Sequence, residues 1–296
     1  MRLAALDIGT NSVRLLVADR TEKGLLPQQR EWRATRLGSG LISCGLLSST
    51  GKEATLRAVL ELRELALSLG ATTIRAVGTS ALREAQDGRG FARALKDVTG
   101  LDVQILSPEE EATLSYNGAA GTLLLPAGVL VFDLGGGSCE LSWQENSALH
   151  LNSLKIGAVY LTESYFHDDP PSGQDIALAR KEIKAQLAKL DLGGKPLVGL
   201  GGTVTSLAAM VAGMTCYDAA KIHGFVLSRA AVNKMLAHML SIPAGERQKI
   251  PGIQPSRADI LPAGTLVVEE LLLSCRAEEL TVSEGDLLVG LLLHQH

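Results

Sequence analysis

Two short turns, each preceded by a carboxylate, give the strongest chemical signal in this sequence. Asp7-Ile8-Gly9-Thr10-Asn11-Ser12 and Asp133-Leu134-Gly135-Gly136-Gly137-Ser138 both follow apolar runs typical of buried strands. Such a strand carries its carboxylate to the strand end, and the glycine-containing turn then exposes successive backbone N–H groups that can bind an anion. Either turn alone is also typical of an ordinary hairpin; the pair favours phosphate chemistry.

The two turns belong to an internal repeat. Residues 5–15 align without gaps onto residues 131–141, and Asp, Gly and Ser coincide in the two segments. Because a fixed offset between similar strand–turn–strand segments indicates duplication, we expect two similar domains.

Side chains after each turn alternate between the two faces of a strand. Ser12 therefore shares a face with Arg14, and Ser138 shares one with Glu140. If the two copies face each other across a cleft, Arg14 is expected to contact phosphate oxygens, while Glu140, Asp7 and Asp133 are expected to hold a divalent cation.

A third glycine turn and an arginine add to this set. Gly201-Gly202-Thr203 lies between an apolar strand and the start of a predicted helix, whose free N–H groups favour anions. Arg83 follows the end of a predicted strand and could bind a phosphate through two parallel hydrogen bonds. A surface arginine on a helix is the alternative interpretation.

Three glutamates open one predicted helix, in Ser107-Pro108-Glu109-Glu110-Glu111-Ala112. Carboxylates in a first turn complement the helix dipole, worth about 0.3–1 kcal/mol each, and need no function. The alternative is that one of them, partly buried near the glycine turns, acts as a general base on water.

Strands and helices alternate along the chain, which indicates an α/β fold. Strands are expected at 2–19 as a hairpin, 28–35, 73–77, 103–106, 129–133, 139–143, 150–155, 197–200 and 280–282. Helices are expected at 50–69, 80–85, 90–98, from Ser107 onward, 159–166, 174–190, from Gly201 to Ala212, through most of the following stretch, and at the C-terminus.

Composition excludes several classes of protein. With 296 residues, 46% of them hydrophobic and 20% charged, the chain is long enough for two globular domains. A net charge of −4 argues against a nucleic-acid partner. The four widely spaced cysteines suggest free thiols, and the N-terminus reaches Asp7 without a secretory apolar run, so we expect a cytoplasmic protein without a membrane partner.

Five motifs in order resemble those of the exopolyphosphatase and guanosine pentaphosphate phosphohydrolase family. They are the two Asp-x-Gly turns, Gly78-Thr79-Ser80-Ala81-Leu82-Arg83, the segment 107–112 and Gly201-Gly202-Thr203, and together they span nearly the whole chain. The resemblance implies two ribonuclease-H-like domains of the actin, sugar kinase and heat-shock ATPase superfamily around a central cleft. We place the domains at 1–120, with 281–296 packing back on the first, and at 121–280.

The resemblance also implies roles for individual residues. Glu111 would be the general base, with Glu140 and Arg83 as further catalytic residues, and Asp133, Glu140 and Asp7 would hold magnesium. The remaining implied residues would bind phosphate: Gly9, Thr10, Asn11, Ser12, Arg14, Gly135, Gly136, Gly137, Ser138, Gly201, Gly202 and Thr203.

The expected reaction is hydrolysis of the terminal phosphoanhydride of inorganic polyphosphate, with guanosine pentaphosphate as the alternative substrate. A superfamily kinase and a non-catalytic phosphate or nucleotide sensor are alternatives of other classes, and a homodimer is expected by resemblance alone. One departure from the family stands near the C-terminus, where Leu288 and Val289 occupy positions that normally carry Arg-Glu. One cationic contact is therefore expected to be missing.

Overall fold

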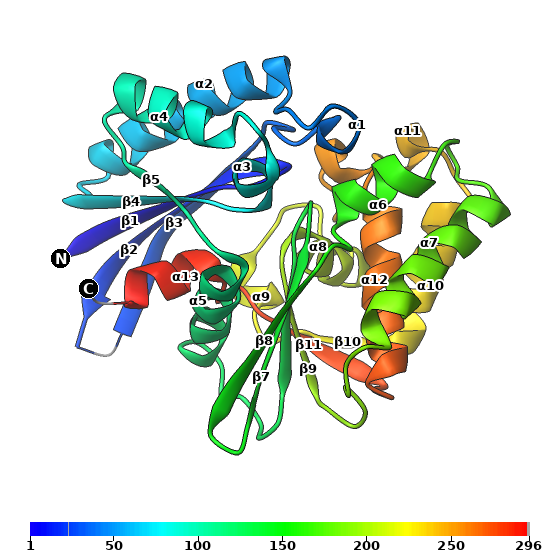
Figure 1. Cartoon of the computed structure of the whole chain (residues 1–296). Helices are drawn as coiled ribbons and strands as arrows, with labels where there is room; N and C mark the ends of the chain where they lie inside the picture. The colour runs from blue at the N-terminus through cyan, green and yellow to red at the C-terminus, as the bar shows by residue number, and fades with distance from the viewer. Residues whose placement is uncertain (23, 295–296) are drawn as a thin grey trace. The chain divides into compact units, whose positions relative to one another are not determined.

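The computed structural model describes residues 1–22 and 24–294 of the chain. These residues form two compact units (Figure 1). Unit 1 contains Met1–Gly121 and the segment that begins at Gly285, and unit 2 contains Thr122–Glu284.

Unit 1 is built on a five-stranded mixed sheet in the order β3-β2-β1-β4-β5. The first three strands form an antiparallel meander, and β4 and β5 continue it in parallel with β1. The strands are β1 (Arg2–Ile8), β2 (Ser12–Thr21), β3 (Gly24–Ala34), β4 (Thr73–Gly78) and β5 (Val103–Ile105).

Helices cover both faces of this sheet. One core contains Ala4, Leu6 and Ile8 of β1, and the other contains Leu3 and Ala5, because successive side chains of a strand point to opposite faces. The helices are α1 (Leu41–Cys44), α2 (Ser49–Ser68), α3 (Ser80–Glu84), α4 (Gly88–Thr99), α5 (Pro108–Ala120) and α13 (Leu287–Leu293).

Glycines allow α5 and α13 to approach closely. A Cβ on Gly118 would lie 2.0 Å from the carbonyl oxygen of Asp286, and a Cβ on Gly290 would lie 1.9 Å from that of Leu114. Both distances are far below van der Waals contact and both involve backbone atoms. The close packing of the last helix against α5 therefore depends on these two residues.

Unit 2 has a six-stranded sheet in the order β10-β11-β9-β6-β7-β8. Read from β8 to β11, its order and strand directions repeat those of unit 1, with β6 to β8 antiparallel and β9 and β11 parallel to β6. The strands are β6 (Leu130–Leu134), β7 (Cys139–Glu145), β8 (Ala148–Leu154), β9 (Leu197–Leu200), β10 (Val226–Ser228) and β11 (Glu279–Val282).

The helices of unit 2 pack around one large core of Leu, Ile, Val and Ala side chains. They are α6 (Ala158–Tyr165), α7 (Gly173–Leu187), α8 (Gly202–Val211), α9 (Ala219–Ile222), α10 (Arg229–Leu240), α11 (Ala244–Arg247) and α12 (Leu261–Ser274), with a 3-10 turn at Pro255–Arg257. Among the described residues, no helix is both long and apolar enough to cross a membrane.

The two mixed sheets share one strand order, with β10 added at the edge of the second, which confirms the predicted α/β fold with two similar domains. The expected strands and main helices are present within a few residues of their predicted bounds. One expectation is wrong: the stretch assigned to helices contains β10, a three-residue strand that pairs antiparallel with β11. So short a strand carries no measurable periodicity, and its hydrogen bonds to β11 and the burial of Leu227 in the core of unit 2 stabilise it.

The pairing of β11 sets the boundary at which the chain leaves unit 2. Thr281 and Val282, which the sequence analysis grouped with the N-terminal domain, pair in parallel with β9 of unit 2. The chain returns to unit 1 only at Gly285, and α13 then packs in the core of unit 1.

A histidine links the two places where the chain passes between the units. The backbone N–H of Glu284 donates to Nδ1 of His223 at 3.1 Å, and Nε2 of the same ring lies 3.1 Å from the carbonyl oxygen of Thr122. Since a backbone N–H can only donate, Nδ1 is unprotonated and Nε2–H donates to Thr122. One imidazole thus joins the first and the last residue of unit 2.

Candidate functional site

The first glycine turn, between β1 and β2, directs its N–H groups to one side. Gly9 N donates to the carbonyl of Ser12 at 3.0 Å, and the carbonyls of Thr10 and Asn11 accept from backbone N–H groups of residues 35–38 at 2.9–3.0 Å. In a trans peptide the N–H points opposite to the preceding carbonyl, so the N–H groups of Asn11 and Ser12 point away from that segment. The Asn11 Nδ2 amide is buried and has no partner among the described residues.

The second glycine turn, between β6 and β7, has the same geometry. Gly135 N donates to the carbonyl of Ser138, again at 3.0 Å. The carbonyls of Gly135, Gly136 and Gly137 accept from the N–H groups of residues 157–160 at the start of α6, at 2.8–3.2 Å. Three consecutive N–H groups, from Gly136 to Ser138, therefore point away from α6 and form an anion-binding nest.

Equivalent residues of the two turns lie at equivalent positions in the two sheets. Asp7 pairs with Arg14 across β1 and β2, and Asp133 pairs with Glu140 across β6 and β7. Each repeat thus places a carboxylate beside a charged residue directly at the base of its turn. The charge of that partner is positive in unit 1 and negative in unit 2.

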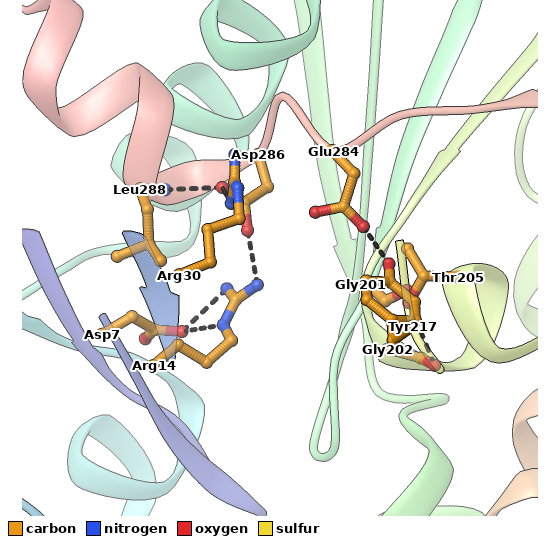
Figure 2. A network of polar contacts seen from close by, with 10 residues as sticks. All are labelled: Asp7, Arg14, Arg30, Gly201, Gly202, Thr205, Tyr217, Glu284, Asp286 and Leu288. Atoms are coloured by element: carbon orange, nitrogen blue, oxygen red, sulfur yellow. Dashed lines mark hydrogen bonds and ion pairs between the residues drawn. The ribbon is translucent and has the colours of Figure 1, made fainter. Parts of the chain in front are cut away.

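The third glycine turn lies beside the second. Gly201 has a φ of 92°, and a Cβ there would lie 2.5 Å from the carbonyl oxygen of Leu134 and 3.2 Å from Oδ1 of Asp133. Only glycine tolerates both the backbone conformation and the close approach. The N-terminus of α8 consequently begins next to the Asp133 carboxylate, and Thr205 Oγ1 lies 3.3 Å from the Gly201 carbonyl inside the first turn of α8 (Figure 2).

Arg257 lies against this third turn, and the sequence analysis missed it. A Cβ on Gly202 would come within 1.8 Å of Arg257 Nη1, so the guanidinium lies over the first residue of α8. Its Nε donates to Gln254 Oε1 at 2.7 Å. The sequence around Arg257 contains only a proline-rich segment without a recognised motif, so no local signal pointed to it.

Asp133 and Glu140 form a carboxylate pair suited to a divalent cation. Both are buried, they are direct cross-strand partners, and Ser153 Oγ donates to Glu140 Oε1 at 2.8 Å. Burial, together with the charges of Glu140 and Asp133, raises the pKa of the Cys139 thiol well above its ordinary value, which reflects the negative potential at this point. A cation would offset the repulsion of two adjacent buried carboxylates.

The Asp133 and Glu140 carboxylates suit a metal ion that takes its remaining ligands from water or substrate. Among the residues that the structure describes, no group of three His, Cys, Asp or Glu side chains could enclose a metal ion. A pair of carboxylates is what Mg²⁺ commonly takes from a protein, completing its octahedron with water and substrate phosphates. In unit 1, Oδ1 of Asp7 is buried without a hydrogen bond among the described residues, as expected of an oxygen that faces a cation.

Arg14 lies between two carboxylates of unit 1 (Figure 2). Its Nε donates to Asp7 Oδ2 at 2.9 Å and its Nη1 donates to Asp286 Oδ2 at 2.6 Å, while Asp286 Oδ1 accepts from the backbone N–H of Leu288 at 3.1 Å. Burial raises the pKa of the Asp7 carboxyl, Arg14 opposes that rise, and the Asp286 charge adds to it. Arg14 thus contacts two carboxylates, and the phosphate contact expected from the sequence stays a prediction.

Asp286 is a second residue that sequence reasoning missed. Its signal was present, because an aspartate directly before an apolar run is typical of a helix N-cap. Arg30 of β3 also reaches it, with Nη1 3.8 Å from Oδ1. Leu288 and Val289, which replace the family's usual Arg-Glu, are both buried in the core of unit 1.

Glu111 and Arg83 meet at the start of α5. Arg83 Nη1 donates to Glu111 Oε2 at 2.8 Å and to the carbonyl of Leu106 at 2.9 Å. Glu111 is buried, while its neighbour Glu110 instead forms the capping box with Ser107. Of the three glutamates in the first turn, Glu110 thus serves the helix itself, and Glu111 is the one held by a guanidinium.

The fold and these sites define a class of protein: a two-domain α/β protein with two similar sheets, each with a glycine turn that follows an aspartate near the end of a strand. The profile of the Ppx/GppA phosphatase family matches residues 16–296, and the chain belongs to that family.

Individual relatives agree with this assignment. The chain is 36% identical to exopolyphosphatase 2 of Mycobacterium tuberculosis, covering 99% of this chain and 98% of that protein. The crystal structure of the Aquifex aeolicus Ppx/GppA family member has a TM-score of 0.84 at 32% identity, covering 99% of this chain and 96% of that one. An exopolyphosphatase from Cytophaga hutchinsonii has the same fold, with a TM-score of 0.90 at 24% identity over 99% and 96% of the two chains.

Proposed function

We propose that this protein is an exopolyphosphatase, which hydrolyses the terminal phosphoanhydride of inorganic polyphosphate and releases orthophosphate. The carrying observation is the buried Glu111 carboxylate held by Arg83 at the N-terminus of α5. The full-length similarity to an exopolyphosphatase of Mycobacterium tuberculosis supports polyphosphate as the substrate.

The glycine turns are suited to bind the phosphates. The outward-facing N–H groups of residues 11–12 and 136–138 provide donors without a side chain, and the N-terminus of α8 adds the positive end of a helix dipole. Arg257, over Gly202, adds a permanent positive charge at that helix N-terminus. These groups would neutralise charge as it develops on the phosphoryl oxygens, which is the main requirement of phosphoryl transfer.

Glu111 would act as the general base. Its carboxylate takes a proton from a water molecule, the water oxygen forms a bond to the terminal phosphorus, and the bond from that phosphorus to the bridging oxygen breaks. The shortened polyphosphate leaves with the electron pair. Because the guanidinium of Arg83 donates to Glu111, it favours the ionised carboxylate that this step needs.

Magnesium would be held by Asp133 and Glu140, and Asp7 would offer a carboxylate oxygen at the equivalent position of unit 1. The bound ion supplies charge neutralisation to the phosphates. Arg14 holds Asp7 through Oδ2, which leaves Oδ1 as the oxygen for the cation. In this arrangement Arg14 orients the Asp7 carboxylate, and its binding to phosphate stays a prediction.

The test compares orthophosphate release by the wild type and by Glu111→Gln, with magnesium, on long polyphosphate, tripolyphosphate and guanosine pentaphosphate. We expect fastest release from polyphosphate and a loss of about 10²–10⁴-fold in kcat for Glu111→Gln, with substrate binding kept. Glu110→Gln is the matched control, since glutamine also completes a capping box and should leave kcat unchanged.

Other outcomes would replace the proposal. Faster release from guanosine pentaphosphate would make that nucleotide the substrate. Binding without release from any of the three would indicate a sensor, and release that depends on an added acceptor would indicate a kinase.

A further inference from the structure

A basic pocket in unit 1 combines Arg83 with cations that have no role in the site described above. It has a volume of about 630 Å³ and lies between α3, α4, β5 and the start of α5. Its lining includes the apolar side chains Leu82 and Val103 and four cations, Arg83, Arg89, Arg93 and Lys96.

Three of these cations lie on one face of a single helix. Arg89, Arg93 and Lys96 follow each other along α4 at spacings of four and three residues, which places them on the same side of the helix. Ala92, between them on α4, also lines the pocket, and Ala92 and Leu95 pack against the core of the unit. Arg89, Arg93 and Lys96 are exposed, so the basic face of α4 is open to solvent.

Most carboxylates near the pocket are already paired. Lys96 Nζ lies 3.2 Å from Asp102, and Glu110 accepts from the Ser107 N–H at 2.7 Å in the capping box. Within residues 1–22 and 24–294, neither Arg89 nor Arg93 forms an ion pair. The pocket thus carries two uncompensated guanidinium groups, the side chains best suited to bind phosphate oxygens.

The pocket also has a direct connection to the proposed base. Arg83 lines the pocket, and its Nη1 donates to Glu111. A polyanion whose terminal phosphate lies at Glu111 would find further cations along α4 for phosphates nearer its other end.

We propose that this pocket is a binding site for the distal part of an extended phosphate chain, with Arg89 and Arg93 as its ligands. This inference rests on the proposed exopolyphosphatase activity and goes beyond it, because it makes affinity depend on chain length. A short substrate ends before it reaches α4, whereas a long chain gains two guanidinium contacts.

The experiment compares Arg89→Ala/Arg93→Ala with the wild type on long-chain polyphosphate and on tripolyphosphate. Charge-assisted contacts predict a KM raised about tenfold or more on the long chain, with kcat kept, and both constants unchanged on tripolyphosphate. Arg57→Ala/Arg63→Ala on α2 removes the same charge outside the pocket. This control should leave KM and kcat unchanged for both substrates.

The outcomes separate the two claims. No release by the wild type from any polyphosphate overturns the proposed function. If the wild type is active and Arg89→Ala/Arg93→Ala has an unchanged KM for the long chain, only the proposed binding site is overturned. The same holds if KM rises equally for tripolyphosphate, or rises equally in the α2 control. Since both arginines are exposed, the variant is expected to keep the wild-type melting temperature, and Arg89→Glu/Arg93→Glu should enlarge the long-chain effect.

Discussion

Arg83 uses one nitrogen, Nη1, to bind both Oε2 of Glu111 at 2.8 Å and the carbonyl oxygen of Leu106 at 2.9 Å. The backbone at the end of β5 thereby fixes the guanidinium, and the guanidinium fixes the carboxylate. The orientation of Glu111 thus depends on a residue from another element, 28 positions earlier in the chain.

A double-mutant cycle should show this coupling. Arg83→Ala is expected to lower kcat because Glu111 loses the group that orients it, and Glu111→Gln should lower kcat further. If the arginine acts through the glutamate, the double variant will resemble Glu111→Gln alone, with a coupling of about 0.5–3 kcal/mol. Additive losses in kcat would show that Arg83 acts independently of Glu111.

The close contact between α5 and α13 predicts that one added methyl group, at Gly118, will lower the stability of unit 1. Gly118→Ala would place a Cβ 2.0 Å from the Asp286 carbonyl, so the helices must separate, at a cost of about 1–3 kcal/mol or more. Hydrogen–deuterium exchange should accelerate in α5, α13 and β1, while peptides of unit 2 serve as the internal reference.

Gly90→Ala is the matched control for that substitution. Gly90 lies in α4, and a Cβ there would meet nothing within 4 Å. Because alanine favours a helix over glycine by about 0.5–1 kcal/mol, this variant should be as stable as the wild type or more so. Equal destabilisation by both variants would contradict the close-packing argument.

The two hydrogen bonds of His223 predict a local change in protection. His223→Phe keeps a flat ring but removes both nitrogens, so the backbone N–H of Glu284 loses its acceptor. Amide exchange at Glu284 is expected to accelerate markedly. His238→Phe, at an exposed position on α10, should leave that amide unchanged, and slow exchange in both variants would show that another acceptor protects it.

The four free cysteines should differ in reactivity. Cys44 and Cys216 are exposed, whereas Cys139 and Cys275 are buried. Burial raises the pKa of Cys275 from its ordinary 9.0 to about 11, with Lys195 opposing the rise. At pH 8 an aromatic disulfide reagent should modify two thiols in the native protein and four in denaturant.

The raised thiol pKa also sets the sign of a pH effect on stability. Above pH 9.0 the unfolded chain loses the Cys275 proton while the folded chain keeps it until about pH 11. The free energy of unfolding should therefore fall as the pH rises through this window. Cys275→Ala should weaken that dependence in urea titrations, and an unchanged slope would exclude Cys275 as its source.

The sequence by itself determined the local parts of this protein. Strand periodicity, the capping signals at Ser107 and the repeat of Asp-x-Gly turns depend on neighbours within a few residues, so they predicted both turns and every element except β10 and the shortest helices. The repeat also predicted two similar sheets, because equal local patterns fold into equal supersecondary units.

Only the tertiary structure decided which partners the charged side chains take. Arg14 binds Asp286, 272 positions away, and Arg257 lies against Gly202. Nothing in the sequence around these residues indicates that either pair is in contact. The three-residue β10 takes its strand hydrogen bonds from β11, which is distant in the chain. Such contacts join residues that are distant in the chain, and their energies depend on a geometry that no local pattern encodes.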